Sequence, residues 1–297
     1  MRRLCQFALV LMCLALGTAS AQDARPYVAL GDSIPFGYNP TVALGDLADY
    51  HGYPQYVSAA LNLAPLANAS CPGQTSGSFI NVAAPDNGCN EWRMFGLPLF
   101  VIYSSVAQSQ LDYAVSFLRQ NPKTSLVTIT IGGDDLLLLE HNCATQFVNN
   151  PAAIDSCELA GLGDVLVKFA KNLTAIYLAI RIEARYEGPL VAVNYFSSDY
   201  GNAIETTSLT ELNQITLGLT TLFRGRVADA FSAFQKASAG SGGLPCAVGL
   251  AFANPSLPGG CDVHPTPLGQ QLIANLVVQA LKRHEFPLRL SQFSDNF

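Results

Sequence analysis

The stretch Tyr27-Val28-Ala29-Leu30-Gly31-Asp32-Ser33 opens with four apolar residues and then turns polar. A short apolar run that ends in glycine and two polar residues is typical of a strand buried on both faces of a sheet. The stretch therefore predicts a first strand over residues 27–30, with Ser33 just beyond its carboxyl end. In open sheets of parallel strands, ligands bind beyond that end.

Strands and helices alternate along the rest of the chain. Strand-like composition recurs at residues 66–68, 126–131, 190–194 and 227–231. Helical spacing is found at residues 53–61, 108–119, 164–185, 209–223 and 267–282, and the last of these helices has Thr266 as its N-cap and Pro267 in its first position. Residues 71–98, rich in glycine, proline and asparagine, are predicted to form a loop. The alternation indicates an α/β fold, in which helices cover both faces of a parallel sheet.

Four polar segments follow or flank these predicted strands. Since active sites lie at the carboxyl rim of such sheets, we expect the four segments to meet there. They are Gly31-Asp32-Ser33, Cys71-Pro72-Gly73, Gly132-Gly133-Asp134-Asp135 and the loop that carries His264.

Ser33 and His264 are the candidate catalytic pair. A serine hydroxyl is a poor nucleophile unless a base takes its proton. Of the four histidines, His264 has the most rigid predicted setting, between Asp262-Val263 and Pro265 and just before the capped last helix. The plainer alternative is a serine in a turn and a histidine in an ordinary loop.

The first 21 residues have the features of an export signal. Arg2 and Arg3 precede an apolar run over residues 4–16, which is too short to span a bilayer. Ala19-Ser20-Ala21 then matches the small-x-small cleavage pattern, so the mature chain is expected to begin at Gln22. We therefore expect a secreted or periplasmic protein with one domain over residues 22–297; an uncleaved anchor is the alternative.

The six cysteines beyond the leader fall in three couples that are close in sequence. An even number of cysteines behind an export signal indicates disulfides. We predict the pairs Cys71–Cys89, Cys143–Cys157 and Cys246–Cys261. Zinc binding is the alternative, although the sequence contains no Cys-x-x-Cys motif.

The charge of the chain restricts its partners. The net charge is −6 and 13% of the residues are charged, whereas about a quarter is usual in soluble proteins. An acidic chain is not expected to bind nucleic acid or an anionic lipid surface through electrostatics. We find no metal or cofactor motif, and no apolar run outside the leader approaches membrane-spanning length. We expect a monomer that acts on a small-molecule or lipid ester.

Four blocks of the sequence resemble the GDSL family, also called SGNH hydrolases. The blocks are residues 28–33, the glycine of Cys71-Pro72-Gly73-Gln74, residues 128–136, and Asp262-Val263-His264-Pro265. The resemblance covers most of residues 22–297. It implies a three-layer α/β/α sandwich with a flavodoxin-like parallel sheet. It also implies a secreted bacterial esterase or lipase that cleaves carboxylic esters through an acyl-enzyme.

The resemblance also implies a role for each matching residue. Ser33 is the nucleophile and His264 is the general base. The oxyanion of the tetrahedral intermediate is held by the backbone N–H groups of Ser33 and Gly73 and by the side chain at position 134. Each fixed donor of this kind is worth about 2.7–4 kcal/mol. Gly73 fits this role because a residue without Cβ lets the backbone approach closely.

The sequence departs from the family at position 134, where the family has asparagine and this chain has Asp134. An ionised carboxylate about 4 Å from an oxyanion would cost about 4 kcal/mol at an effective dielectric constant of about 20. We hypothesise that Asp134 is protonated or turned away, with activity favoured at mildly acidic pH. The adjacent carboxylates, Asp32 and Asp135, are interpreted as hydrogen-bond acceptors that shape the loops.

A second departure concerns the acid that orients the histidine. The family places it three residues before the histidine, where this chain has Cys261. Asp262 stands two residues before His264, and side chains two apart in an extended segment point the same way. Asp262 is therefore the candidate acid. The alternative is a Ser–His dyad whose histidine is held by a backbone carbonyl.

The substrate is less well defined by the sequence. The apolar residues between Asn90 and Ile102 are either the wall of an acyl pocket or a loop buried against the core. Two other functions stay open besides ester hydrolysis. One is acyl transfer to an alcohol on the same scaffold, and the other is a non-catalytic binding protein, which the presence of Asp134 makes conceivable.

Overall fold

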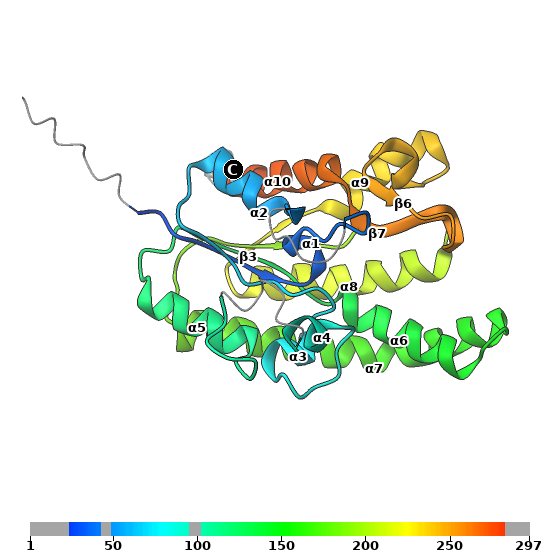
Figure 1. The fold of residues 1–297 in the computed structure, drawn as a ribbon, viewed down its shortest axis with the longest axis horizontal. Coiled ribbons are helices and arrows are strands. Elements are labelled where there is room, and N and C mark those ends of the chain that lie inside the picture. The colour runs from blue at the N-terminus through cyan, green and yellow to red at the C-terminus, as the bar shows by residue number, and fades with distance from the viewer. Residues whose placement is uncertain (1–23, 43–48, 95–101, 283–297) are drawn as a thin grey trace, which may run out of the picture.

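We describe the protein from a computed structural model, which covers residues 24–42, 49–94 and 102–282 (Figure 1). The predicted export signal, residues 1–21, lies outside the described residues. Within them, no helix is both long and apolar enough to cross a membrane.

A parallel sheet of five strands forms the centre of the molecule (Figure 1). Its order is β2-β1-β3-β4-β5, the order of flavodoxin-like sheets. The strands are β1 (Tyr27–Gly31), β2 (Leu66–Asn68), β3 (Leu126–Thr130), β4 (Leu190–Val193) and β5 (Arg226–Ala228). In register, Tyr27 lies opposite Leu126 and Gly31 opposite Thr130, so β1 and β3 end at the same edge. The α/β prediction is confirmed.

Helices cover both faces of this sheet (Figure 1). On one face lie α2 (Tyr53–Leu61) and α10 (Pro267–Lys282); on the other lie α5 (Gln110–Gln120), α7 (Pro151–Leu178) and α8 (Ala203–Leu222). Because both faces are covered, every residue of β1, β3 and β4 is buried. This explains why these strands have continuous apolar runs instead of alternation. The three-layer α/β/α sandwich is therefore confirmed.

Several elements differ from the sequence prediction. Residues 71–98, predicted as loop, contain the short helices α3 (Ser76–Ile80) and α4 (Cys89–Met94). Helix α3 is only five residues long and begins with a capping box between Thr75 and Ser78, so it shows no apolar periodicity. Helix α6 (Gly133–Gln146) was not predicted, and α7 begins 13 residues before the predicted start, at a Pro151 that Asn150 caps.

The carboxyl-terminal part differs in a similar way. Strand β5 ends at Ala228 because Asp229 caps a helix that was not predicted, α9 (Ala230–Ser238). His264 lies on a strand instead of the predicted loop: β6 (Ala251–Ala253) and β7 (Cys261–Pro265) form an antiparallel pair. The predicted cap of α10 is present, since Thr266 Oγ1 accepts a hydrogen bond from Gly269 N at 3.3 Å.

All three predicted disulfides are confirmed. Cys71–Cys89 closes the loop that contains α3, Cys143–Cys157 joins α6 to α7, and Cys246–Cys261 ties the start of β7 to the segment before β6. Each cross-link spans 14 to 18 residues. In the chain-entropy model a loop of this length stabilises the fold by about 3 kcal/mol. Two of the three bonds lie in segments that reach the sheet edge where β1 ends.

Candidate active site

Ser33 is placed by a sharp change of direction at the end of β1. Gly31 has a φ of 132°, and a Cβ at this residue would lie 1.9 Å from the carbonyl oxygen of Thr130. The chain then enters α1 (Ser33–Phe36), whose first turn is capped by Asp32 Oδ1, which accepts from Ile34 N at 2.9 Å. Ser33 is thus the first residue of a short helix that leaves the sheet edge.

Two fully buried glutamines hold the backbone on either side of Ser33. Gln110 Nε2 donates to the Gly31 carbonyl at 2.9 Å, and its Oε1 accepts from Gly31 N at 2.5 Å. Gln270, on α10, donates to the Ile34 carbonyl at 3.0 Å and accepts from Tyr53 N at 2.8 Å. Neither glutamine could be identified from the sequence, because each contact joins segments far apart in the chain.

The side chains of Ser33, His264 and Asp262 form a continuous line of hydrogen bonds. His264 Nε2 lies 3.0 Å from Ser33 Oγ, and His264 Nδ1 lies 2.5 Å from Asp262 Oδ1. The same carboxylate oxygen accepts from the backbone N of His264 at 2.9 Å. Desolvation raises the pKa of Asp262, but the hydrogen bonds and charge of His264 outweigh it and hold that pKa below its ordinary value. Asp262, and not a backbone carbonyl, occupies the position next to Nδ1.

An aromatic cluster covers the other side of the histidine. The Tyr38 ring lies 4.6 Å from the His264 ring, centroid to centroid. Tyr38 in turn contacts Tyr50 and Trp92, and Phe36 packs against both of these rings. The ring contact limits rotation of the imidazole and leaves Nε2 directed at Ser33.

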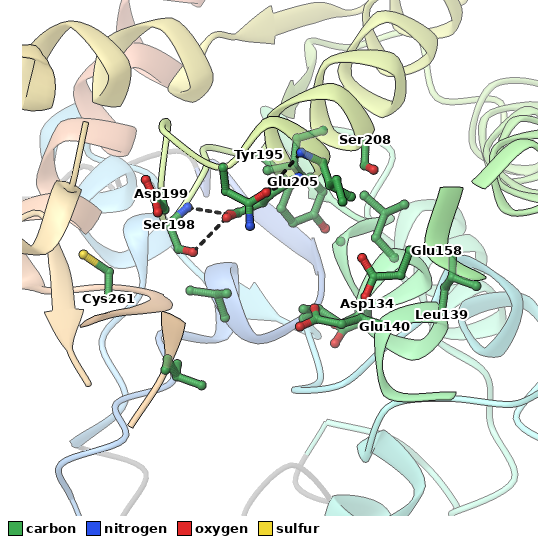
Figure 2. Close-up of a pocket in the computed structure, with 18 of the residues that line it drawn as sticks. Asp134, Leu139, Glu140, Glu158, Tyr195, Ser198, Asp199, Glu205, Ser208 and Cys261 are labelled. Carbon is green, nitrogen blue, oxygen red and sulfur yellow. Dashed lines mark hydrogen bonds between the residues drawn. The ribbon is translucent and has the colours of Figure 1, made fainter. Parts of the chain in front are cut away.

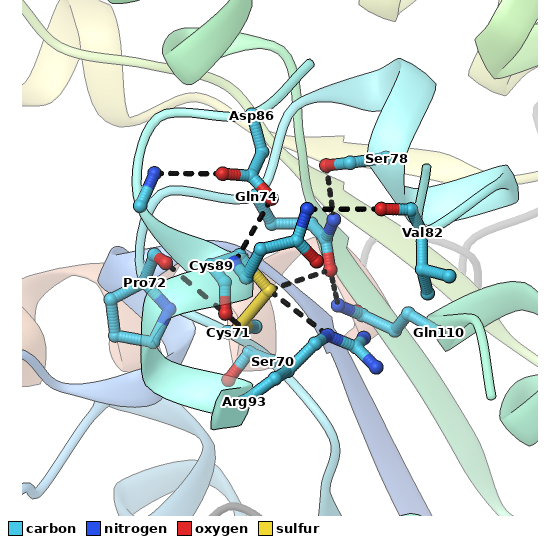
Figure 3. Close-up of a disulfide and its surroundings, with 12 residues drawn as sticks. Ser70, Cys71, Pro72, Gln74, Ser78, Val82, Asp86, Cys89, Arg93 and Gln110 are labelled. Atoms are coloured by element: carbon cyan, nitrogen blue, oxygen red, sulfur yellow. Dashed lines mark hydrogen bonds between the residues drawn. A yellow bond between two sulfur atoms is a disulfide. The ribbon is translucent and has the colours of Figure 1, made fainter. Parts of the chain in front are cut away.

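Gly73 lies two residues after Cys71, in the loop that the Cys71–Cys89 disulfide closes, and it contacts Asn87 near the other end of that loop. Figure 3 shows this disulfide and its surroundings. It has a φ of 79°, and a Cβ here would lie 2.3 Å from the carbonyl oxygen of Asn87. The glycine is therefore required by contact with Asn87 as well as by its backbone conformation. Within the described residues, the backbone N–H of neither Gly73 nor Ser33 has a hydrogen-bond acceptor.

Asp134 lies in the first turn of α6 and is 5% exposed. Its Oδ1 accepts from Asn87 Nδ2 at 2.9 Å. Burial raises the pKa of Asp134 well above its ordinary value, and the nearby Asp32 raises it further. No basic side chain forms an ion pair with Asp134 in the part of the chain that the structure describes.

The two neighbouring aspartates are hydrogen-bond acceptors in the structure. Asp135 accepts from the Ser76 backbone N at 2.7 Å and from Ser76 Oγ at 2.6 Å, which joins α6 to α3. Asp32 accepts from the Tyr195 hydroxyl besides capping α1. Burial raises the pKa of Asp32 to about 7 and that of Asp135 to about 6.

A pocket of about 640 Å³ extends from Ser33 between α6, α7 and α8 (Figure 2). Its apolar lining includes Ile34, Leu136, Leu137, Leu139, Ile154, Ile204, Leu209, Leu257 and Val263. Its acidic lining consists of Asp32, Asp134, Glu140, Asp155, Glu158, Asp199 and Glu205. Figure 2 shows Asp134, Glu140 and Glu158 on one wall, and Ser198, Asp199 and Glu205 on the other. No lysine, arginine or histidine is among the described residues that line it.

The segment from Asn90 to Ile102 does not line this pocket where it is described. Trp92 packs in the aromatic cluster, and Met94 is exposed; residues 95–101 lie outside the described residues. The apolar wall that the structure describes comes from α6, α7 and α8. Among the described residues, no group of three or more His, Cys, Asp or Glu side chains is arranged to hold a metal ion.

The fold defines the class of protein, an α/β/α sandwich with a flavodoxin-like sheet. The model of the GDSL-like Lipase/Acylhydrolase family matches residues 29–272, from β1 to the middle of α10. The chain therefore belongs to this family. Membership supports hydrolysis of carboxylic esters as the general reaction.

Solved structures share the fold at low sequence identity. An extracellular lipase from Streptomyces rimosus is 19% identical, with a TM-score of 0.54, over 86% of this chain and 100% of that one. A phospholipase A1 from Streptomyces albidoflavus is 20% identical, with a TM-score of 0.54, over 86% and 98%. An acetylxylan esterase from Geobacillus stearothermophilus is 15% identical, with a TM-score of 0.50, over 87% and 94%. Comparison with curated proteins gives no significant match.

The buried carboxyl groups predict that the fold is more stable at mildly acidic pH. The folded-state pKa of Asp32, about 7 against an ordinary 3.8, means that the unfolded chain releases this proton first as pH rises. Between these two pKa values the folded protein keeps a proton that the unfolded chain has released, so the free energy of unfolding falls as pH rises from about 4 to about 7. We expect Asp32→Asn, which keeps an acceptor for Ile34 N, to lose less stability than the wild type between about pH 5 and about pH 8 in thermal melts.

The exposed Asp164 on α7 provides the matched control. Asp164→Asn should retain the pH dependence of the wild type. Equal losses of stability in Asp32→Asn and the wild type would contradict a raised pKa at Asp32.

Proposed function

We propose that this chain is an exported serine esterase that hydrolyses neutral carboxylic esters through an acyl-enzyme on Ser33. The observation that carries the proposal is the line of hydrogen bonds from Asp262 through His264 to Ser33, with 2.5 Å and 3.0 Å between the joined atoms. A hydroxyl within hydrogen-bond distance of an imidazole whose other nitrogen faces a carboxylate is the arrangement that activates serine as a nucleophile.

In the proposed reaction, Ser33 Oγ attacks the ester carbonyl carbon while its proton passes to His264 Nε2. Asp262 stabilises the imidazolium through Nδ1 without taking its proton. The tetrahedral intermediate then collapses, the C–O bond to the alcohol breaks, and His264 returns the proton to the departing alkoxide. Water repeats the sequence on the acyl-enzyme with His264 again as base, which releases the acid and regenerates Ser33.

Three groups are proposed to hold the oxyanion. The backbone N–H groups of Ser33 and Gly73 have no other acceptor among the described residues, which supports their availability. Asp134 is the third group, as a neutral carboxylic acid. Its raised pKa, caused first by desolvation and then by the charge of Asp32, supports a protonated side chain that can donate a hydrogen bond.

The pocket supports a substrate with an apolar acyl chain and no anionic group. Leucine and isoleucine side chains from α6, α7 and α8 provide apolar surface directly beyond Ser33. Further along the walls lie Glu140, Asp155, Glu158, Asp199 and Glu205, whose carboxylates repel a negative substrate, and no basic side chain is among the described residues that line the pocket. A volume of about 640 Å³ lies within the usual range of about 300–1,000 Å³ for small-molecule sites.

Export and a single catalytic domain are part of the proposal. The leader over residues 1–21 predicts secretion or release into a periplasm, and the three disulfides support an oxidising compartment. Residues 22–297 are then the mature chain, which we expect to act as a monomer.

The first prediction concerns turnover and substrate class. Purified protein should release p-nitrophenol from butyrate and longer-chain p-nitrophenyl esters, and Ser33→Ala should abolish this release. The p-nitrophenyl monoester of succinate has a chain as long as that of butyrate but carries a carboxylate. It should have a kcat/KM lower by about tenfold or more, because repulsion between two like charges about 4 Å apart near a protein surface costs about 4 kcal/mol, and a tenfold change needs only about 1.4 kcal/mol.

A folded protein without turnover of any ester would exclude catalysis and favour a binding function. Equal turnover by Ser33→Ala would show that another group carries the reaction. Equal kcat/KM for the two four-carbon esters would refute selection by the acidic walls alone. Added alcohol should not divert the acyl group, and ester exchange in its presence would instead indicate acyl transfer.

The second prediction concerns Asp262. Replacing it with asparagine should leave the fold intact, because the amide oxygen can still accept from the His264 backbone. The same oxygen, Oδ1, serves both the backbone N–H and Nδ1. The amide therefore either keeps its oxygen beside Nδ1, without the negative charge that stabilises the imidazolium, or turns its N–H toward Nδ1 and favours the wrong tautomer, so kcat should fall by up to about 10⁴-fold. Asp164→Asn is the control. A kcat within about tenfold of the wild type would mean that Asp262 is dispensable.

The third prediction concerns the protonation of Asp134. If its O–H donates to the oxyanion, kcat should fall as pH rises through the raised pKa of Asp134, because the ionised form opposes the oxyanion. Asp134→Asn cannot ionise, so its kcat should match the wild type at acidic pH and exceed it at alkaline pH. The measurement is kcat from about pH 5 to about pH 9. A large loss of kcat in Asp134→Asn at neutral pH would contradict the assignment.

A further inference from the structure

Asn87 lies between Gly73 of the second sequence block and Asp134 of the third, and no pattern in the sequence marks it. Its backbone N–H donates to the Gly73 carbonyl at 2.8 Å, and its own carbonyl fills the space beside Gly73. Its side-chain Nδ2 donates to Asp134 Oδ1 at 2.9 Å. Asn87 therefore contacts two of the three residues proposed to hold the oxyanion.

The backbone around Asn87 is restrained from both sides. Asp86 accepts through one carboxylate oxygen from Gly88 N and through the other from Asn90 N, each at 3.0 Å. Cys89, two residues after Asn87, is joined to Cys71 by a disulfide (Figure 3). The amide of Asn87 is thus presented to Asp134 by a cross-linked loop, although the residue itself is exposed.

The hydrogen bond from Asn87 decides which oxygen of Asp134 can donate. Oδ1 is committed as an acceptor, and Oδ2 has no partner among the described residues. The groups that face Asp134 are Asp32 beside α1, Asp135 on α6, Asp86 on the loop and the Tyr195 hydroxyl after β4. Three carboxyl groups among these neighbours oppose its ionisation. In the neutral acid, the proton is then on Oδ2.

The result has the hydrogen-bond pattern of an asparagine at position 134, with one oxygen that accepts from the loop and one group that donates. We propose that Asn87 is a positioning residue for the oxyanion site, and that it directs the Oδ2–H of Asp134 toward the substrate. The Asn87–Asp134 pair then provides the oxyanion donor that the family's asparagine provides alone. This inference rests on the proposed function.

The same hydrogen bond has a second consequence. A donor to Oδ1 stabilises the ionised carboxylate, and so lowers the pKa of Asp134 below the value that its burial alone would produce. Loss of the donor should therefore raise that pKa. A residue that only stiffens the loop would not move the pKa of Asp134.

The test is the pH profile of kcat for Asn87→Ala in the wild type and in the Asp134→Asn background. We expect Asn87→Ala to lower the maximal kcat by about tenfold or more, a fraction of the 10²–10³ that a whole oxyanion donor contributes. The alkaline limb of its profile should move to higher pH. KM should change little, because Asn87 does not line the pocket. In the Asp134→Asn background there should be no alkaline limb to move.

Asn90→Ala is the matched control. Asn90 belongs to the same loop and holds it by donating from Nδ2 to the Val82 carbonyl at 2.9 Å, without contact to Asp134. This variant should keep the alkaline limb of the wild type, whatever it does to stability.

Two results would overturn the inference. One is an Asn87→Ala profile with the alkaline limb of the wild type, whether or not kcat falls. The other is a wild-type profile that has no alkaline limb. Both presuppose turnover that depends on Ser33. Turnover that survives Ser33→Ala would instead overturn the proposed function itself, so the two failures are distinct.

Discussion

The position of Ser33 depends on the hydrogen bonds that two buried glutamines make to the backbone on either side of it. The Gln110 amide accepts from the backbone N–H of Gly31 and donates to its carbonyl, and the Gln270 amide donates to the carbonyl of Ile34. Gly31 has the left-handed conformation that the adjacent strand requires. Since Gln110 is on α5 and Gln270 on α10, which lie on opposite faces of the sheet, residues from both helix layers hold the backbone that presents the Ser33 hydroxyl to His264.

Protonation divides the carboxyl groups of the site into two kinds. Asp262 faces an imidazole, and its pKa is held low by that contact despite its partial burial. Asp32, Asp134 and Asp135 are buried among themselves without a basic partner in the described part of the chain, and burial raises their pKa values. One charged carboxylate beside the base and a neutral acid beside the oxyanion are what the proposed ester hydrolysis needs.

The parts of the fold and of the site that could be predicted from the sequence are those that local patterns mark. The strands over Tyr27–Gly31 and Leu126–Thr130 are apolar runs with clear ends, and the disulfides join cysteines close in sequence. Ser33 directly follows β1 and His264 lies on β7, which contacts α1 at the same edge of the sheet, so the two side chains meet there. Asn87 and Gln270 were missed because their contacts span 47 and 236 residues, and no local pattern marks them. Helix α3 was missed because capping, not periodicity, forms it.

The central claim is that Ser33 is the nucleophile that His264 activates. It is tested most directly by intact-mass analysis of the folded protein after treatment with a fluorophosphonate, which reacts covalently with activated serine hydroxyls. We expect one adduct, located on Ser33 by peptide mapping, and its loss in both Ser33→Ala and His264→Ala. An adduct on another residue, or none on a protein that still turns over esters, would contradict it.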